Sequence, residues 1–368
     1  MRSSLSRINK LVAQIAQKNN CLKQTKIRHF SAQPNNTEDL EQSGLEVKIT
    51  HSTPSNSLSD SPEIPEPLIA SNDTALVDSL LSYTSSLVDE SGINIIAFSG
   101  GVDSSLAAAL VNQVFNNNIG YEGSVKAVIG VSPSLPKRQL DLAQSIASSI
   151  DIDLIEVPTF EGNDETYISN EGQACFICKN TLYSALEAVA ATANKLSQGN
   201  KSSNVVLFNG TNADDTKDPT RLGLLSAKSF SVRSPLIHIT KDEVRRAAKH
   251  LNLPNWNYAA SPCLRSRLAI GVEATENHLK AVNMAEEKLR EILQIDETVN
   301  MRVRMLSGKR AMIELDKYFI DSINHKQFDG NVESLLHDKG YDEFCGELGF
   351  TGGIGVRAFK TGSVSLKN

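Results

Sequence analysis

The chain has 368 residues, of which 40% are hydrophobic, and a formal net charge of −6. This length can bury a large core and is enough for two or three domains. No apolar run reaches the roughly 18 residues of a spanning helix, and the acidic balance does not favour nucleic acid, so neither a membrane nor a nucleic acid is expected as a partner. Five cysteines, an odd and sparse set, indicate metal or catalytic roles in a reducing compartment rather than a disulfide framework.

Residues 1–30 differ in composition from the rest of the chain. They contain Arg and Lys throughout but no Asp or Glu, and apolar residues from Leu5 to Ile15 share one helical face. A basic, acid-free amphipathic segment is typical of a mitochondrial-type transit peptide, here with cleavage expected after Phe30. This predicts a protein of the mitochondrial matrix; a plastid address and a disordered basic tail are the alternatives.

Residues 31–73 are rich in Ser, Pro, Asn and acidic residues and have no sustained apolar period, so we expect a disordered linker. A folded domain is expected over 74–257, where short apolar runs alternate with segments of helical periodicity. Predicted strands are 93–98, 125–132, 153–159 and 204–210, and predicted helices include 136–150 and 180–196. This alternation predicts an α/β fold with a doubly wound, mostly parallel sheet and sites at the carboxyl ends of its strands.

One strand-loop-helix unit has the clearest chemical pattern. The apolar run INIIAF is followed by SGGVDSS and then by an Ala- and Leu-rich helix. Two glycines let the backbone approach an anion, and amides and hydroxyls at a helix N-terminus favour phosphate oxygens. Asp103 suits Mg²⁺, which prefers one or two carboxylates together with phosphate oxygens. The expected nucleotide-binding residues are Ser99, Gly100, Gly101, Asp103, Ser104 and Ser105, joined by Asn212 and Asp214 after the strand 204–210.

The same loop lacks the lysine of G-x-x-x-x-G-K-[ST], and the chain has no G-x-G-x-x-G. SGGVDSS instead resembles the PP-loop of the ATP pyrophosphatase superfamily, whose fold is adenine nucleotide alpha hydrolase-like. The resemblance implies ATP and Mg²⁺ as cofactors, cleavage of ATP between the α and β phosphates, adenylation of a substrate oxygen, and a catalytic role for Asp103. A Gly-Gly turn capped by Ser and Asp, with no ligand, is the structural alternative.

Cys175 and Cys178 form a C-x-x-C pair in QACFICKN, and Cys263 lies downstream in SPCLRSR. By pattern alone the pair is a redox couple, half of a zinc site, two ligands of an iron–sulfur cluster, or chemically inert. A thioredoxin-like couple expects a different context, and the chain has no second C-x-x-C and no H-x₃₋₅-H for zinc. Cys345 or a histidine could still complete a zinc site.

Three longer segments make the resemblance specific to one family within the superfamily: NGTNADDTKDPTRLGLLSAKSFSVRSPL, KDEVRRAAKHLNLPNWNYAASPCLRSRL and MRVRMLSGKRAMIEL. From about residue 93 to 314 the chain resembles the LarE family of ATP-dependent sulfur transferases. The resemblance implies adenylation of a carboxylate on a pyridinium mononucleotide, a small nucleotide-like substrate, and its conversion to a thiocarboxylate in nickel-pincer cofactor synthesis.

LarE-like proteins are of two kinds. One kind sacrifices a single cysteine, and the other holds a [4Fe–4S] cluster on three cysteines, with one iron free to carry sulfide. Cys175, Cys178 and Cys263 match the three-cysteine kind. This match implies that they are catalytic and hold the cluster, and that a sulfide or persulfide donor supplies the sulfur. Arg265 stands where a small residue is expected in the family, and the pattern gives it no role.

Arg302 and Arg304 in MRVRM alternate with apolar residues and therefore share one face of a predicted strand. Adjacent guanidiniums can hold a phosphate, Arg267 could join them, and Glu314 could orient one of them. By pattern alone, a solvated charged face explains the two arginines as well. The resemblance favours the substrate phosphate as their ligand.

Residues 258–368 are expected to form a smaller C-terminal α+β domain for substrate binding and oligomerisation. We expect an amphipathic helix over 275–293, a hairpin over 297–316 with its turn at Ser307 and Gly308, and a helix followed by a strand over 334–348. Because LarE-like enzymes form homo-oligomers, self-association is expected. Rival functions are an amide-forming ligase similar to NAD synthetase, tRNA or other small-molecule thiolation, and an iron–sulfur carrier that binds nucleotide.

Overall fold

The structure is a computed structural model that describes residues 73–196, 204–217, 222–326 and 331–360. The predicted transit peptide, and the predicted linker up to residue 72, lie outside these ranges. The first described element, α2, spans Asp73–Leu87. Among the described residues, no helix combines the length and the apolar character needed to cross a membrane.

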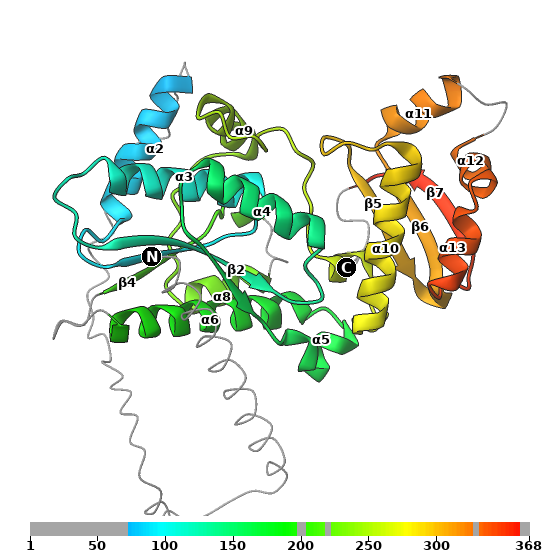
Figure 1. Ribbon diagram of the computed structural model, residues 1–368, viewed down its shortest axis with the longest axis horizontal. Helices are drawn as coiled ribbons and strands as arrows, with labels where there is room; N and C mark the ends of the chain where they lie inside the picture. The colour runs from blue at the N-terminus through cyan, green and yellow to red at the C-terminus, as the bar shows by residue number, and fades with distance from the viewer. Residues whose placement is uncertain (1–72, 197–203, 218–221, 327–330, 361–368) are drawn as a thin grey trace, which may run out of the picture.

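The larger of two sheets has four parallel strands in the order β3-β2-β1-β4. Its strands are β1 (Ile93–Ala97), β2 (Ser124–Val131), β3 (Leu154–Pro158) and β4 (Val205–Phe208). Helices α3 (Val102–Asn116) and α4 (Lys137–Ser149) cover one face, and α6 (Ala174–Leu196) and α8 (Leu222–Ser229) cover the other (Figure 1). The predicted doubly wound, parallel α/β fold is confirmed.

Burial on both faces explains why the central strand reads as a continuous apolar run. All five residues of β1 are buried. Ile96 packs into the core beneath α3 and α4, whereas Ile95 packs into the core beneath α6 and α8. Strands β2 and β3 are added on one side of β1, and β4 is added on the other side, so the order of the strands reverses between β1 and β4. In open parallel sheets, ligands bind at such a switch point.

The smaller sheet has the order β5-β6-β7. Strands β5 (Met301–Leu306) and β6 (Arg310–Leu315) are antiparallel, and β7 (Ile354–Ala358) is parallel to β6. Between β5 and β6 lies the short turn η3 (Ser307–Lys309), in which Gly308 has a φ of 73°. The predicted hairpin is therefore present at the expected turn, and α10 (Glu276–Leu293) packs against it.

The segment 334–348 differs from the prediction of a helix followed by a strand. It contains two helices, α12 (Val332–Asp338) and α13 (Tyr341–Glu347), which flank Gly340 at a φ of 69°. Tyr341 and Cys345 are four residues apart and are both fully buried. This is helical spacing, and the strand in this region comes later, as β7.

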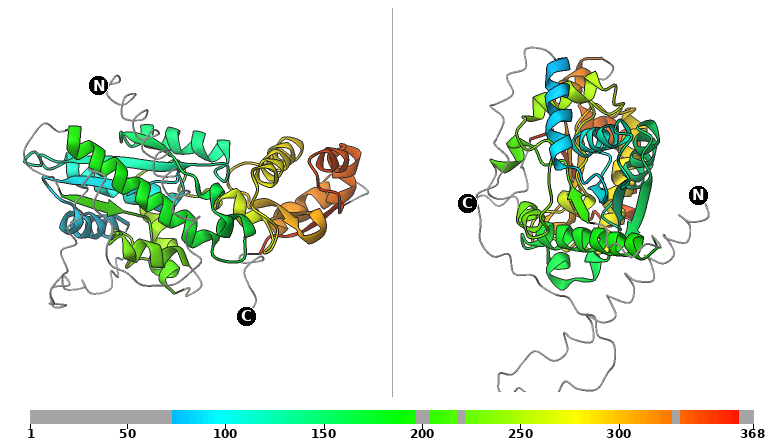
Figure 2. Two further views of the ribbon diagram at one scale, coloured as in Figure 1. Left: turned by 90° about the horizontal axis from the view of Figure 1, so that it is seen from below. Right: turned by 90° about the vertical axis from the view of Figure 1, so that its left-hand side faces the viewer.

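The two sheets are joined by a shared core. The C-terminal core around α10 and β5 also includes Tyr167 and Ala174, which belong to α5 (Glu165–Ser169) and α6. Figures 1 and 2 show the smaller sheet beside the larger one, next to α5 and the adjacent end of α6. The remaining elements are η1 (Glu161–Asn163), α7 (Ala213–Thr216), α9 (Lys241–His250), η2 (Leu264–Arg267) and α11 (Lys317–Lys326).

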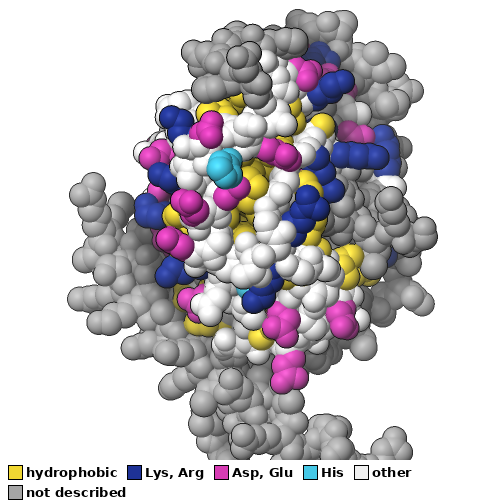
Figure 3. Space-filling model, turned by 90° about the vertical axis from the view of Figure 1, so that its right-hand side faces the viewer, with side chains coloured by type: hydrophobic (Ala, Val, Ile, Leu, Met, Phe, Trp, Pro, Cys, Tyr) yellow, Lys and Arg dark blue, Asp and Glu magenta, His cyan; other side chains and the backbone are white. Residues whose placement is uncertain are grey.

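The outer face of the C-terminal part has no single sign of charge. In Figure 3, acidic and basic side chains are interspersed around a central group of hydrophobic side chains. This face therefore presents no continuous basic surface of the kind that follows a nucleic-acid backbone.

Candidate active site

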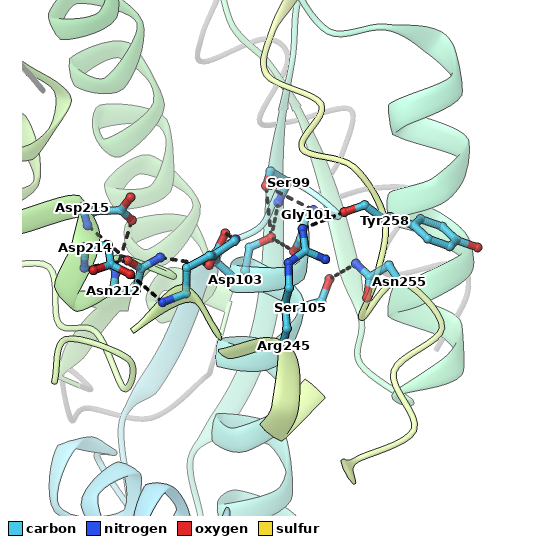
Figure 4. A network of polar contacts seen from close by, with 12 residues as sticks. Ser99, Gly101, Asp103, Ser105, Asn212, Asp214, Asp215, Arg245, Asn255 and Tyr258 are labelled. Carbon is cyan, nitrogen blue, oxygen red and sulfur yellow. Dashed lines mark hydrogen bonds and ion pairs between the residues drawn. The ribbon is translucent and has the colours of Figure 1, made fainter. Parts of the chain in front are cut away.

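The glycine-rich loop lies at the carboxyl end of β1 and leads directly into α3 (Figure 4). Gly100 has a φ of 70°, and a Cβ atom there would lie 2.9 Å from the Cα atom of Ala143. Only glycine fits this left-handed, crowded position. The Gln139 side chain donates to the Ser99 carbonyl at 2.6 Å, so α4 also supports the loop.

The loop serines form part of this support. The Ser104 hydroxyl accepts from the Ser99 amide at 3.2 Å and donates to the Gly101 carbonyl at 3.0 Å. The Ser105 hydroxyl accepts from Asn255 at 3.0 Å. Both hydroxyls are therefore engaged with protein atoms and hold the loop in its conformation.

Asp103 lies between two partners from distant parts of the chain. Its Oδ1 accepts from the Asn212 side chain at 3.0 Å, and its Oδ2 pairs with the ammonium group of Lys241. The backbones approach closely here, because a Cβ atom on Gly210 would lie 2.5 Å from the backbone carbonyl carbon of Asp103. The structure thus brings the predicted residues Asp103 and Asn212 into contact.

Asn212 and Asp214 organise the neighbouring turn. Asn212 accepts from the amides of Asp214 at 3.0 Å and Asp215 at 3.1 Å, which caps the short helix α7. Asp214 accepts from the Lys241 amide at 2.8 Å and pairs with Lys217 at 2.9 Å. These hydrogen bonds, that of the Lys241 amide before those of Lys217, lower the pKa of Asp214.

Three residues of this site were missed by the sequence analysis. Lys241 begins α9 and reaches Asp103. Asn255 is 1% exposed and donates to the Gly100 carbonyl at 2.9 Å. Arg245 donates to the carbonyls of Trp256 at 2.8 Å and Tyr258 at 3.0 Å. The one sequence signal for Lys241 is that a lysine stands at the start of a predicted helix. Such lysines are too common for this signal to identify a site residue.

The predicted cysteines come from two segments. Cys175 and Cys178 lie in the first turns of α6, three residues apart, which places them on one side of the helix. Cys263 is the residue before η2. Cys175 is exposed, whereas Cys178 and Cys263 are half-buried. The pair is therefore helical, and not in the loop that C-x-x-C motifs often occupy.

The electrostatics of the thiols place them in one neighbourhood. Burial, followed by the charges of Glu161, Cys263 and Cys175, raises the pKa of Cys178 to about 12. Glu161 is 3% exposed, and its Oε1 accepts from Ser132 at 2.7 Å and from the Cys178 thiol at 4.0 Å. Among the described residues, no group of three or more His, Cys, Asp or Glu side chains is arranged to hold a metal ion.

The thiol segments lie at the same edge of the sheet as the nucleotide loop. Ser134 follows β2, and its carbonyl accepts from the amide of Leu264, which follows Cys263, at 2.8 Å. Glu161 follows β3. Since the carboxyl ends of parallel strands share one edge, the thiols and the loop after β1 belong to the same side of the protein.

The predicted phosphate-binding arginines are deeply buried. Arg267, Arg302 and Arg304 are 1%, 4% and 6% exposed, so the alternative of a solvated charged face is wrong. Arg304 pairs with Glu314 at 2.6 Å, and Arg357, which the sequence analysis missed, pairs with the other oxygen of Glu314 at 2.5 Å.

Arg267 and Arg302 differ in their partners. Arg267 pairs with Glu286, a residue also missed from the sequence, at 2.9 Å. Arg302 donates to the carbonyls of Met301 and Ala260 and lies over the Phe359 ring. Burial, followed by repulsion from Arg267, lowers the pKa of Arg302 to about 9. Of the three arginines, Arg302 is the one whose hydrogen bonds within the described ranges go to backbone carbonyls alone.

Together, the parallel sheet with its glycine loop at the carboxyl edge and the smaller mixed sheet define a PP-loop-like α/β protein. No protein-family model matches the chain. The uncharacterized protein slr1717 of Synechocystis sp. is 37% identical over 200 residues, which cover 54% of this chain and 69% of that protein. The pyridinium-3,5-bisthiocarboxylic acid mononucleotide synthase of Lactiplantibacillus plantarum is 29% identical over 199 residues, 54% of this chain and 67% of that enzyme.

A third relative is similar over a larger share of the chain. The uncharacterized protein MJ0830 of Methanocaldococcus jannaschii is 26% identical over 255 residues, 68% of this chain and 87% of that protein. The chain belongs to the same family as the Synechocystis protein.

Proposed function

We propose that the protein is an ATP-dependent sulfur transferase that adenylates a carboxylate of a pyridinium dicarboxylate mononucleotide and converts it to a thiocarboxylate. The observation that carries the proposal is the placement of a phosphate-binding loop and three thiols at one edge of the same parallel sheet. The L. plantarum relative, named as a synthase of the bisthiocarboxylic acid mononucleotide, supports this substrate class.

The loop suits the first half-reaction, in which a substrate carboxylate oxygen attacks the α-phosphorus of ATP. The bond from that phosphorus to the bridging oxygen of the β-phosphate breaks, pyrophosphate leaves, and an acyl-adenylate forms. The N-termini of α3 and α9 meet where Asp103 pairs with Lys241. Two helix N-termini and a lysine favour the charge that develops on the phosphates.

Mg²⁺ fits Asp103, since one carboxylate with phosphate oxygens is its usual ligand set. Both Asp103 oxygens have protein partners, Asn212 and Lys241. We propose that Lys241 turns to the phosphates when ATP enters, which frees Asp103 Oδ2 for the ion. Asn212 then keeps the carboxylate oriented through Oδ1.

In the second half-reaction, sulfur attacks the carbonyl carbon of the acyl-adenylate, the C–O bond to AMP breaks, and the thiocarboxylate and AMP leave. We propose that Cys175, Cys178 and Cys263 hold a [4Fe–4S] cluster. Three soft thiolate donors in one neighbourhood suit such a cluster. When bound, it would supply a metal ion with an open position for sulfide. Sulfide is the proposed sulfur source; a persulfide donor would in addition require a thiol as reductant to break its S–S bond, with formation of a disulfide.

The buried arginines suit the phosphate of the substrate mononucleotide. Arg302 is held by carbonyls rather than by a carboxylate, so its charge remains available to a phosphate. Glu286 and Glu314 hold Arg267 and Arg304 in place beside it. Self-association of the chain and import into mitochondria through residues 1–30 are further proposals, which sedimentation and sequencing of the mature N-terminus would test.

The function is tested with anaerobically purified protein, ATP and the pyridinium dicarboxylate mononucleotide. We expect pyrophosphate release that depends on the carboxylate, and a product in which sulfur replaces oxygen, detected by mass spectrometry. Cys175→Ala should release pyrophosphate but form no thiocarboxylate. An amide product formed from ammonia at the same rate by wild type and Cys175→Ala would contradict sulfur transfer and favour an amide-forming ligase, for which no cysteine is needed.

The metal is tested by iron, sulfide and zinc analysis with an absorption spectrum. Cys345→Ala is the matched control, because Cys345 is 0% exposed and lies in α13, outside the segments α6 and η2 that carry the three thiols. We expect iron and sulfide in the wild-type and Cys345→Ala proteins and neither in Cys263→Ala. Stoichiometric zinc without iron would overturn the cluster.

A further inference from the structure

Arg265 contacts the thiol site directly. It lies in η2, and its Nη2 donates to the Sγ atom of Cys175 at 2.7 Å, while its Nη1 donates to Asn170 Oδ1 at 3.0 Å. One planar guanidinium therefore joins the first turn of α6 to the residue that ends α5. A planar fork can hold two acceptors in fixed directions, which a lysine ammonium group cannot do.

The second acceptor of this fork is itself fixed. Asn170 is 1% exposed and has a φ of 54°. Its amide nitrogen donates to the carbonyls of Ala269 and Val272, both at 3.0 Å. Asn170 is thus anchored to the segment that follows η2, so Arg265 is held at one end by a rigid part of the protein.

Arg265 also differs from the neighbouring buried arginine. Arg267, two residues later, pairs with Glu286 at 2.9 Å, whereas the side-chain hydrogen bonds of Arg265 within the described ranges go to Cys175 and Asn170. Burial lowers the pKa of Arg265, but the charges of Cys263 and Cys175 outweigh it and raise the pKa. The guanidinium stays charged and faces the sulfurs.

We infer that Arg265 is a positioning residue that holds Cys175 of α6 against the η2 segment carrying Cys263, so that the separate thiols form one site. What this site does rests on the proposed function. The contact between Arg265 and Cys175 is an observation that does not depend on it.

Two consequences follow from the contact. Without it, the first turn of α6 loses its tether to η2, and its amides should open more often to solvent. A bound cluster would also lose a charged N–H donor beside one of its sulfur ligands. Hydrogen bonds and charge at the sulfurs set the reduction potential of such a cluster, and loss of a cation should make the potential more negative.

The first test uses hydrogen–deuterium exchange of the full-length, metal-free protein, with wild type, Arg265→Ala, Arg265→Lys and the control Arg246→Ala. Arg246 pairs with Asp73 at the surface, remote from the thiols. We expect exchange in peptides covering residues 171–178 to rise severalfold in Arg265→Ala, to rise less in Arg265→Lys, and to be unchanged in Arg246→Ala. Exchange that is unchanged in Arg265→Ala overturns the inference, and a rise across the whole protein shows general destabilisation, which also overturns it.

The second test measures iron retention against a chelator and the reduction potential of the reconstituted proteins. Faster iron loss and a more negative potential in Arg265→Ala, with partial rescue of the potential by Arg265→Lys, support the inference. Unchanged retention and potential overturn a role at the site. If wild type binds no iron, the cluster of the proposed function fails, and the exchange experiment alone decides whether Arg265 positions Cys175.

Discussion

The ammonium group of Lys241 pairs with the carboxylate of Asp103, although the two residues are 138 positions apart in the chain. Lys241 is the first residue of α9, and Asp103 is the second residue of α3. The pair therefore joins two helix N-termini at the mouth of the glycine loop (Figure 4). Such a junction concentrates positive potential where a polyphosphate would bind.

Removal of this lysine should impair adenylation. We expect Lys241→Met to lower the rate of carboxylate-dependent pyrophosphate release by about 100-fold or more, because a preorganised charge at the phosphates is lost. The matched control is Lys217→Met, since Lys217 is 69% exposed and pairs with the half-exposed Asp214. Equal rates for the two variants would show that Lys241 does not act on ATP.

The close approach at Gly210 provides a steric test of the same site. A Cβ atom in Gly210→Ala would lie 2.5 Å from the backbone carbonyl carbon of Asp103, so either Asp103 or the strand end must move. We expect loss of ATP binding, measured by calorimetry, in a protein with an unchanged circular dichroism spectrum. Gly120→Ala is the control, because a Cβ atom there meets nothing within 4 Å, and normal ATP binding by Gly210→Ala would contradict the proposed site.

The buried arginines should respond differently to removal. Arg267→Met leaves Glu286 buried without its partner and should lower the free energy of unfolding by about 3–5 kcal/mol. Arg302→Met should change it by less than about 1 kcal/mol at pH 7, because two lost hydrogen bonds are offset by relief of a buried cation. Urea unfolding compares them, and similar losses in both variants would contradict the assigned partners.

The pH dependence of stability gives Arg302 a further signature. Its pKa in the folded protein is about 9, below the ordinary value of 12.5, so the unfolded chain binds more protons between these two values. The contribution of Arg302 to the free energy of unfolding should therefore be lowest below pH 9 and increase above pH 9. Arg302→Met should reduce that rise relative to wild type, as measured by urea unfolding at pH 8 and pH 10.

The charge of Glu161 should control the reactivity of Cys178 in the metal-free protein. Burial and then Glu161 raise the pKa of this thiol to about 12, and the thiol reacts as the thiolate. Glu161→Gln should lower that pKa and accelerate alkylation of Cys178 between pH 8 and pH 10 severalfold. Peptide mass spectrometry reports each cysteine separately, and buried Cys345 should show no change; an unaltered Cys178 rate would refute the coupling.

The parallel sheet could be predicted because its signals are local. Apolar runs such as INIIAF and the periodic segments between them follow from burial on two faces, and both persist in the sequence whatever the rest of the chain does. The segment 334–348 was mistaken because a short apolar stretch reads equally as strand or helix. Gly340 and the buried spacing of Tyr341 and Cys345 resolve it only once packing is known.

The sequence by itself determined the fold class, the glycine loop with Asp103, and the three cysteines as candidate reactive groups. Each of these depends on residue type and short spacing. Only the tertiary structure decided their partners: Lys241 for Asp103, Glu286 for Arg267, Glu161 for Cys178 and Arg265 for Cys175. Each of these contacts joins segments from different elements. Their charges act over a few ångströms in space, and the number of residues between two positions in the chain does not predict that distance.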